Sequence, residues 1–244
     1  FRSAYHKKGI WMRILCVSDA HLFINTQDRE RGLIEVLRGE YYDELVLLGD
    51  IYDFWFEYNG FIPAYAIKLT AEILRIAEEK RVHFLSGNHD AWVGKFWENF
   101  GVSVYRLGFE RSLWGKRIFF THGDYFFGGK FSGIIRRVFH SPISISLFKL
   151  VPVEKALKLA KLLSYESRKR QEEVDIGRIE KVVLGLDYDV VVSGHLHKPI
   201  IRNFGGKVFV CVGDWLENFT YLMIQDGKLT IKNREGKILE EIQL

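Results

Sequence analysis

Five short segments of the chain place histidine, aspartate or asparagine directly after an apolar run. They are Asp19-Ala20-His21, Gly49-Asp50, Gly87-Asn88-His89-Asp90, His122-Gly123 and Gly194-His195-Leu196-His197. Five of the eight histidines lie in these segments, a clustering that core packing alone rarely produces. Carboxylate oxygens and imidazole nitrogens are ligands that divalent metal ions accept in hydrolytic sites. The sequence therefore predicts a centre in which two ions, about 3.5–4 Å apart, clamp a phosphate group and activate water.

The elements that position these segments are predicted from the apolar runs before them. The runs cover residues 13–17, 45–48, 82–85, 118–121 and 190–192. They are rich in Val, Ile, Leu and Phe with little alternation, which is typical of strands buried on both faces. Helical spacing in residues 28–37 and 64–80 falls between them, so the layout is α/β. Because ligand sites in such folds lie beyond the carboxyl ends of the strands, we expect all five segments to meet at one edge.

The second half of the chain changes character twice. Residues 126–181 are helical in spacing and rich in Lys and Arg, and we interpret them as a helical cap inserted over the site. Residues 207–244 return to strands, with turns at Asp226-Gly227 and 233–236, and we expect a β layer packed on the core. We therefore expect residues 12–244 to form one domain, and we interpret residues 1–11 as a basic N-terminal extension, which has no long apolar stretch of the signal-peptide type.

Composition limits the classes of protein to consider. The 244 residues are 48% hydrophobic with a formal net charge of +4, which suits a large core and favours anionic substrates or an anionic membrane surface. No apolar run approaches 18 residues, so we expect no transmembrane helix. Cys16 and Cys211 lie in apolar runs and are expected to be buried thiols, so we predict a reducing, cytoplasmic location.

Together the five segments, in this order and each after a strand, resemble the signature of the calcineurin-like metallophosphoesterases. The resemblance implies a four-layer β-sandwich flanked by helices and two divalent ions, with Mn²⁺ as the first choice and Fe, Zn or Mg as alternatives. It also implies a catalytic group of Asp50, Asn88 and His89, with His89 beside the scissile phosphate to steady charge or protonate the leaving oxygen. The implied ligands are Asp19, His21 and His197 for one ion, Asn88, His122 and His195 for the other, and Asp50 as the bridge.

A narrower resemblance rests on Asp53-Phe54-Trp55, the inserted residues 126–181 and Gly213-Asp214-Trp215. These features are similar to the UDP-2,3-diacylglucosamine pyrophosphatases of lipid A synthesis, which release UMP and a lipid monophosphate. This resemblance implies a nucleotide-linked glycolipid as partner, contact with the inner face of the membrane, and no nucleic acid. The chain departs from that family at His89, where the family commonly has Arg. The implied substrate contacts are Trp55, Ser167, Arg168 and Lys169.

Several alternatives stay open at this stage. A phosphodiesterase or nuclease that acts on a soluble nucleotide fits the same metal signature, whereas a non-catalytic scaffold is disfavoured because all seven ligands are present. Phe54 and Phe56 suit either a substrate channel or ordinary core packing. The leucine-rich residues 153–164 suit either a lipid surface or packing on two neighbours. Asp90 and Asp124 suit either orientation of the ligands or catalysis, and His83, in mid-strand, is expected to be structural.

Overall fold

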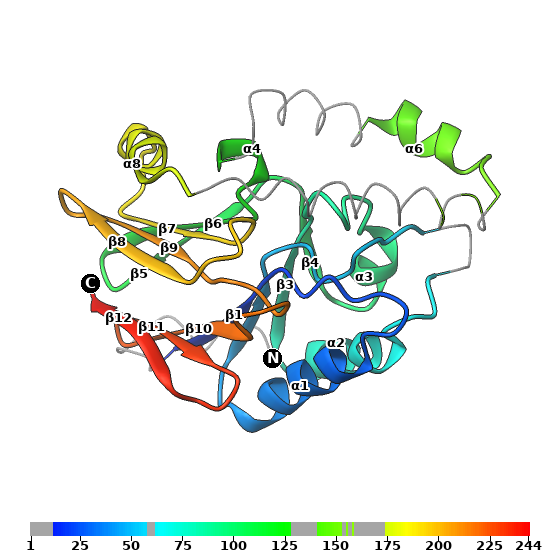
Figure 1. Ribbon diagram of the computed structural model, residues 1–244, viewed down its shortest axis with the longest axis horizontal. Coiled ribbons are helices and arrows are strands. Elements are labelled where there is room, and N and C mark those ends of the chain that lie inside the picture. The colour runs from blue at the N-terminus through cyan, green and yellow to red at the C-terminus, as the bar shows by residue number, and fades with distance from the viewer. Residues whose placement is uncertain (1–11, 58–61, 128–140, 153–154, 156–157, 159–173) are drawn as a thin grey trace, which may run out of the picture.

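The computed structural model describes residues 12–57, 62–127, 141–152, 155, 158 and 174–244, and the structural statements below concern these residues. Two β-sheets face each other, and helices cover their outer faces (Figure 1). This is the two-sheet arrangement with flanking helices that the sequence predicts. Ser167, Arg168 and Lys169, most of the cap and residues 1–11 lie outside the described residues.

The larger sheet has seven strands. Its order is β12 (Ile238–Gln243), β11 (Lys228–Asn233), β10 (Thr220–Gln225), β1 (Arg13–Val17), β2 (Glu44–Leu47), β3 (Arg81–Leu85) and β4 (Ser103–Tyr105). Strands β1 to β4 are mutually parallel, and β10 to β12 are added antiparallel. Because β1, β2 and β3 are parallel, the segments that follow them begin at the same edge of this sheet.

The smaller sheet has five strands. Its order is β5 (Phe109–Leu113), β6 (Lys116–Thr121), β7 (Val190–Ser193), β9 (Lys207–Cys211) and β8 (Ile200–Phe204). The central strands β6, β7 and β9 are parallel, and the two outer strands are antiparallel to them. The segments after β6 and β7 therefore also leave one common edge.

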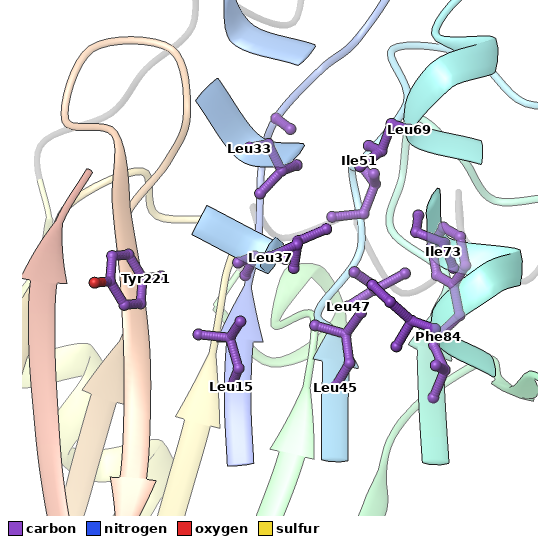
Figure 2. Close-up of a cluster of buried hydrophobic side chains, with 14 of the residues drawn as sticks. Leu15, Leu33, Leu37, Leu45, Leu47, Ile51, Leu69, Ile73, Phe84 and Tyr221 are labelled. Atoms are coloured by element: carbon purple, nitrogen blue, oxygen red, sulfur yellow. The ribbon is translucent and has the colours of Figure 1, made fainter. Parts of the chain in front are cut away.

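Three helices pack beside the larger sheet, namely α1 (Gln27–Gly39), α2 (Ile67–Glu79) and α3 (Lys95–Asn99). Helix α1 buries Leu33, Val36 and Leu37, a spacing that puts all three on one face. These side chains meet Leu15 and Leu45 in the apolar layer between the helices and the sheet (Figure 2). On the other side, α4 (Asp124–Phe127) and α8 (Ile176–Gly185) pack on the smaller sheet, and α6 (Pro142–Phe148) lies beyond α4 in the cap (Figure 1).

Both faces of the central strands are buried, which explains the lack of alternation in the sequence. Along β1, Leu15 and Val17 face the helices, whereas Ile14 and Cys16 join the apolar layer between the two sheets. The two cysteines are buried thiols, as expected. His83 also takes the structural place expected of it, buried and stacked on Phe109 with ring centroids 4.7 Å apart.

The tail differs from its prediction. Instead of one added layer, β9 is built into the smaller sheet, while β10, β11 and β12 extend the larger one. The reason is pairing: β9 completes a parallel pair with β7, and β10 pairs antiparallel with β1. Strands β4, β5 and β8 were not predicted either. The predicted turn at Asp226-Gly227 does connect β10 to β11.

Candidate metal centre

The five polar segments meet where the strand ends of the two sheets converge. Backbone hydrogen bonds join the loops directly: Asp19 N donates to Gly49 O at 3.1 Å and His21 N donates to Asp50 O at 2.9 Å. In the smaller sheet, Gly194 N donates to His122 O at 3.0 Å. Of the seven predicted ligands, four follow strands of the larger sheet, namely Asp19, His21, Asp50 and Asn88. The other three, His122, His195 and His197, follow strands of the smaller sheet.

One group of donors consists of Asp19, His21 and His197, whose ligand atoms lie within 4.8 Å of one another. His197 Nε2 is 3.2 Å from Asp19 Oδ1 and 3.4 Å from His21 Nε2. Asp19 and His21 are buried, and His197 is largely so. These are the three residues that the sequence predicts around one ion.

A second group surrounds His122. Its Nε2 lies 3.2 Å from Asn88 Oδ1 and 3.4 Å from Asp50 Oδ2, and its ring centroid is 5.2 Å from that of His195. The same Asp50 Oδ2 is 3.9 Å from His21 Nε2. Asp50 therefore lies between the two groups, the place expected of a bridging carboxylate.

The donors of these groups fit divalent ions. Asp19 Oδ1 is buried and makes no hydrogen bond, although it faces His197 and His21. A buried oxygen without a partner costs free energy, and a bound cation removes that cost. The donor set of carboxylate, amide and imidazole groups is one that Mn, Fe, Zn and Mg accept to different degrees.

Electrostatics at the site favour positive charge. Burial would raise the pKa of Asp50, but His122 and His89 hold it below its usual range. Burial would lower the pKa of His122, but Asp50 raises it to about 10. Burial and the neighbouring His122 instead lower the pKa of His195 to about 4, which keeps this imidazole neutral and able to bind a metal. A divalent ion supplies the compensation that the buried carboxylates need.

Five of the seven predicted ligands have a left-handed backbone, which non-glycine residues adopt only at a cost of order 1–3 kcal/mol each. Such strain persists where the surroundings enforce it, and it is common at functional sites. The loops are thus held in shapes that turn their side chains toward one place. These residues and their φ angles are Asp19 (53°), His21 (44°), Asp50 (52°), His195 (67°) and His197 (56°).

Two glycines permit the loops to approach the carboxylates. A Cβ atom on Gly87 would lie 2.0 Å from Asp50 Oδ1, and one on Gly194 would lie 2.7 Å from Asp19 Oδ2. Neither distance is compatible with an alanine side chain. Glycine at these positions is expected to let the backbone turn tightly and approach the ions, and the structure shows that both glycines make room for carboxylates.

Asp90 orients the ligand loops. Its carboxylate accepts hydrogen bonds from the backbone N–H groups of Gly87 (2.7 Å), Asp50 (3.1 Å), Ile51 (2.8 Å) and Tyr52 (3.3 Å). It thereby fixes the loop that carries Asp50 to the loop that carries Asn88. Of the two roles left open for Asp90, the structure favours orientation.

Asp53 is a functional residue that the sequence analysis noted only as part of an aromatic motif. Its Oδ1 lies 3.2 Å from His21 Nδ1 and 3.3 Å from His89 Nδ1. His89 also faces the Asp53 carbonyl oxygen at 3.3 Å, and its ring packs edge-on against His21 with centroids 4.6 Å apart. Burial would lower the pKa of His89, but Asp50 and Asp53 raise it to about 9. The spacing of three residues from Asp50 was the available sequence signal.

The aromatic residues after Asp53 pack rather than line the metal centre. Trp55 is fully buried against Tyr52 and Trp97, so the substrate contact expected of it has no support in the structure. Phe54 and Phe56 join an aromatic cluster with Trp92 and Phe148 of α6. This cluster attaches α6 to the loop that follows Asp50.

Comparison with known proteins agrees with this geometry. A family model described as calcineurin-like phosphoesterase matches residues 12–199. A protein of Psychromonas ingrahamii named UDP-2,3-diacylglucosamine hydrolase is 26% identical, over 90% of this chain and 96% of its own. A protein of Porphyromonas gingivalis with the same name is 27% identical, over 91% of this chain and 98% of its own.

Solved structures support the fold. A phosphoesterase from E. coli, Yfce, superposes with a TM-score of 0.54 at 16% identity, covering 95% of this chain and 98% of its own. Vacuolar protein sorting 29 from Cryptosporidium parvum gives 0.51 at 16% identity, covering 97% and 100%. At these identities the likeness concerns the architecture alone.

The close approach at Gly87 makes a prediction about ion binding. Gly87→Ala should displace Asp50, because the new methyl group would overlap its carboxylate, and should lower the Mn²⁺ retained after dialysis. Gly39→Ala is the matched control, because a Cβ there meets nothing within 4 Å. Elemental analysis of both variants checks this, and full Mn²⁺ retention by Gly87→Ala would contradict the role given to Asp50.

Proposed function

The chain belongs to the calcineurin-like phosphoesterase family, and from this premise we propose that it cleaves the pyrophosphate of UDP-2,3-diacylglucosamine, giving UMP and 2,3-diacylglucosamine 1-phosphate. The chain is a hydrolase of the metallophosphoesterase type. The observation that carries the choice of substrate is the likeness to UDP-2,3-diacylglucosamine hydrolases along nearly the whole length of both chains. The reaction would belong to lipid A biosynthesis.

In this proposal, Asp19, His21 and His197 hold one divalent ion, Asn88, His122 and His195 hold the other, and Asp50 bridges them. Mn²⁺ is the first choice, with Fe, Zn and Mg as alternatives. Such ions, when bound, clamp the phosphate oxygens and lower the pKa of a bound water. The distances among these donors support this assignment.

The chain's own contribution to catalysis centres on His89. Its side chain is held by Asp53 at the edge of the metal centre, where it steadies phosphate charge or gives a proton to the leaving oxygen. Both tasks suit an imidazole whose Nδ1 is fixed by Asp53. Ser167, Arg168 and Lys169 remain proposed substrate contacts in the cap.

A second candidate is a phosphodiesterase that acts on a soluble nucleotide. The observation that favours it is His89 itself, which stands where the resembling lipid-cleaving family commonly has Arg. An experiment with both substrates separates the candidates.

We expect the Mn²⁺-loaded protein to release UMP from UDP-2,3-diacylglucosamine with a kcat/KM well above that for soluble nucleotide diesters, because the acyl chains add remote binding energy. Product analysis by mass spectrometry should find the lipid 1-phosphate. No turnover of the lipid substrate together with good turnover of a soluble nucleotide would establish the second candidate instead.

Replacement of His89 tests its role separately. His89→Ala should keep both ions and lower kcat by roughly 10²–10⁴-fold, the usual worth of a general acid. His89→Arg is the matched variant, and partial activity there would indicate charge stabilisation rather than proton transfer. Metal analysis accompanies the kinetics, since a loss of ions in His89→Ala would make His89 a ligand and contradict the proposed set.

We also propose contact with an anionic membrane surface. No helix in the described part of the chain is long and apolar enough to cross a membrane. Helix α6, however, exposes Ile143 and Leu147, and Leu150 follows them, with 74%, 61% and 79% of their surfaces accessible. Lys149 beside them is exposed, and residues 126–181 contain twelve Lys and Arg against six Asp and Glu. Exposed apolar side chains beside a lysine, in a segment with an excess of basic residues, suit shallow insertion among anionic headgroups on the cytoplasmic face.

Replacing Ile143, Leu147 and Leu150 together with Ser should weaken binding to phosphatidylglycerol vesicles by tenfold or more, because inserting one such side chain is worth about 1.5–3 kcal/mol. Vesicle sedimentation measures this. Leu184→Ser on α8, at a position 50% exposed, is the control and should bind as the unaltered chain does. Equal binding by the triple variant would rule out this surface.

A further inference from the structure

The two groups of metal donors differ in what stands behind their histidines. In the first group, His21 Nδ1 lies 3.2 Å from Asp53 Oδ1, and His197 Nδ1 lies 3.7 Å from Asp214 Oδ2. Both carboxylates are buried. Each ring therefore presents Nε2 to the centre and Nδ1 to an acid.

Asp214 is built into its place by the backbone. Its Oδ1 accepts hydrogen bonds from the N–H groups of Leu216, Glu217 and Asn218, at 3.1, 2.9 and 2.9 Å. Asn218 Nδ2 bridges the Asp214 carboxylate, at 3.2 Å, and the His197 carbonyl, at 2.9 Å. The carboxylate is thus fixed toward His197, whose buried Nδ1 makes no hydrogen bond in the described structure.

The second group has a different backing. His122 Nδ1 faces the Leu48 carbonyl oxygen at 2.8 Å, a neutral partner. The second group also contains Asn88, whose side chain is a neutral amide. The first group has the Asp19 carboxylate in the corresponding role. Asp124 and Asp19 act electrostatically on His122 and His195, so the second group is not without negative charge. At the first group, by contrast, a carboxylate faces the Nδ1 atom of each histidine, Asp53 at 3.2 Å from His21 and Asp214 at 3.7 Å from His197.

From this asymmetry we infer that the group of Asp19, His21 and His197 is the tighter of the two metal sites, and that Asp214 and Asp53 are the positioning residues that make it so. This inference rests on the ligand sets of the proposed function. A carboxylate behind a ligating histidine fixes the ring and makes it a stronger donor, and loss of such a partner costs 10–100-fold in metal affinity or activity. The Asp19 carboxylate, whose Oδ1 lies 3.2 Å from His197 Nε2, acts in the same direction.

The test is a titration of chelator-treated protein with Mn²⁺, with the free ion followed by electron paramagnetic resonance. The unaltered chain should bind two ions with dissociation constants at least tenfold apart. Asp214→Asn should weaken the tighter site by about 10–100-fold and leave the weaker one unchanged. Asn88→Ala should remove the weaker site and keep the tighter one.

Two controls make the result decisive. Asp28→Asn removes the same charge from an exposed position on α1 and should alter neither constant. Asp53→Asn acts on the same site through His21 and should also weaken the tighter site. It replaces Asp214→Asn in the test if thermal unfolding shows that Asp214→Asn is misfolded. Two ions of equal affinity, or a loss confined to the weaker site in Asp214→Asn, would overturn this inference alone. Failure of the unaltered chain to bind two ions would overturn the ligand sets of the proposed function.

Discussion

The structure depends on one electrostatic constraint: two carboxylates, Asp19 and Asp50, are buried where two sheets meet, and each must be compensated there. Burial of a charge without a partner is among the costliest arrangements in a protein. The imidazoles that converge on them serve this compensation, and so do the backbone N–H groups of His89 and His195, which donate to Asp50 Oδ1 and Asp19 Oδ2. The strained loops hold these groups in place. The glycines at 87 and 194 follow from the same need, because only they let the backbone come close enough.

The sequence predicts much of this because its signals are local. Apolar runs mark the strands, and a polar residue after each run marks the edge where the ligands lie, so Asp19 and His122 are identifiable without coordinates. The seven predicted ligands lie close together in the structure. The strand-buried His83 and the two buried cysteines are local inferences of the same kind.

What the sequence could not predict depends on contacts between distant residues. Asp53 and Asp214 belong to recognisable motifs, but no local pattern indicates that they face His21 and His197, because only folding brings these residues together. The burial of Trp55 was also not predictable, because an aromatic residue near a site has the same sequence pattern whether it faces a ligand or the core. Strand pairing also decides where the C-terminal strands lie. Strands β9 and β10 join different sheets, and no local sequence pattern indicates which sheet each one joins.

The division of the ligands between the sheets has a mechanical meaning. Of the proposed ligands, Asp19, His21, Asp50 and Asn88 follow strands of the larger sheet, and His122, His195 and His197 follow strands of the smaller sheet. An ion in either position would therefore tie the two halves of the sandwich together. Such an ion acts as a cross-link between residues as far apart in the chain as 19 and 197. Binding of the ion then also raises the free energy of unfolding. This increase grows with the logarithm of the ratio of the free ion concentration to the dissociation constant. The cell's supply of metal would thus set how firmly the two sheets hold together, as well as how fast the site turns over.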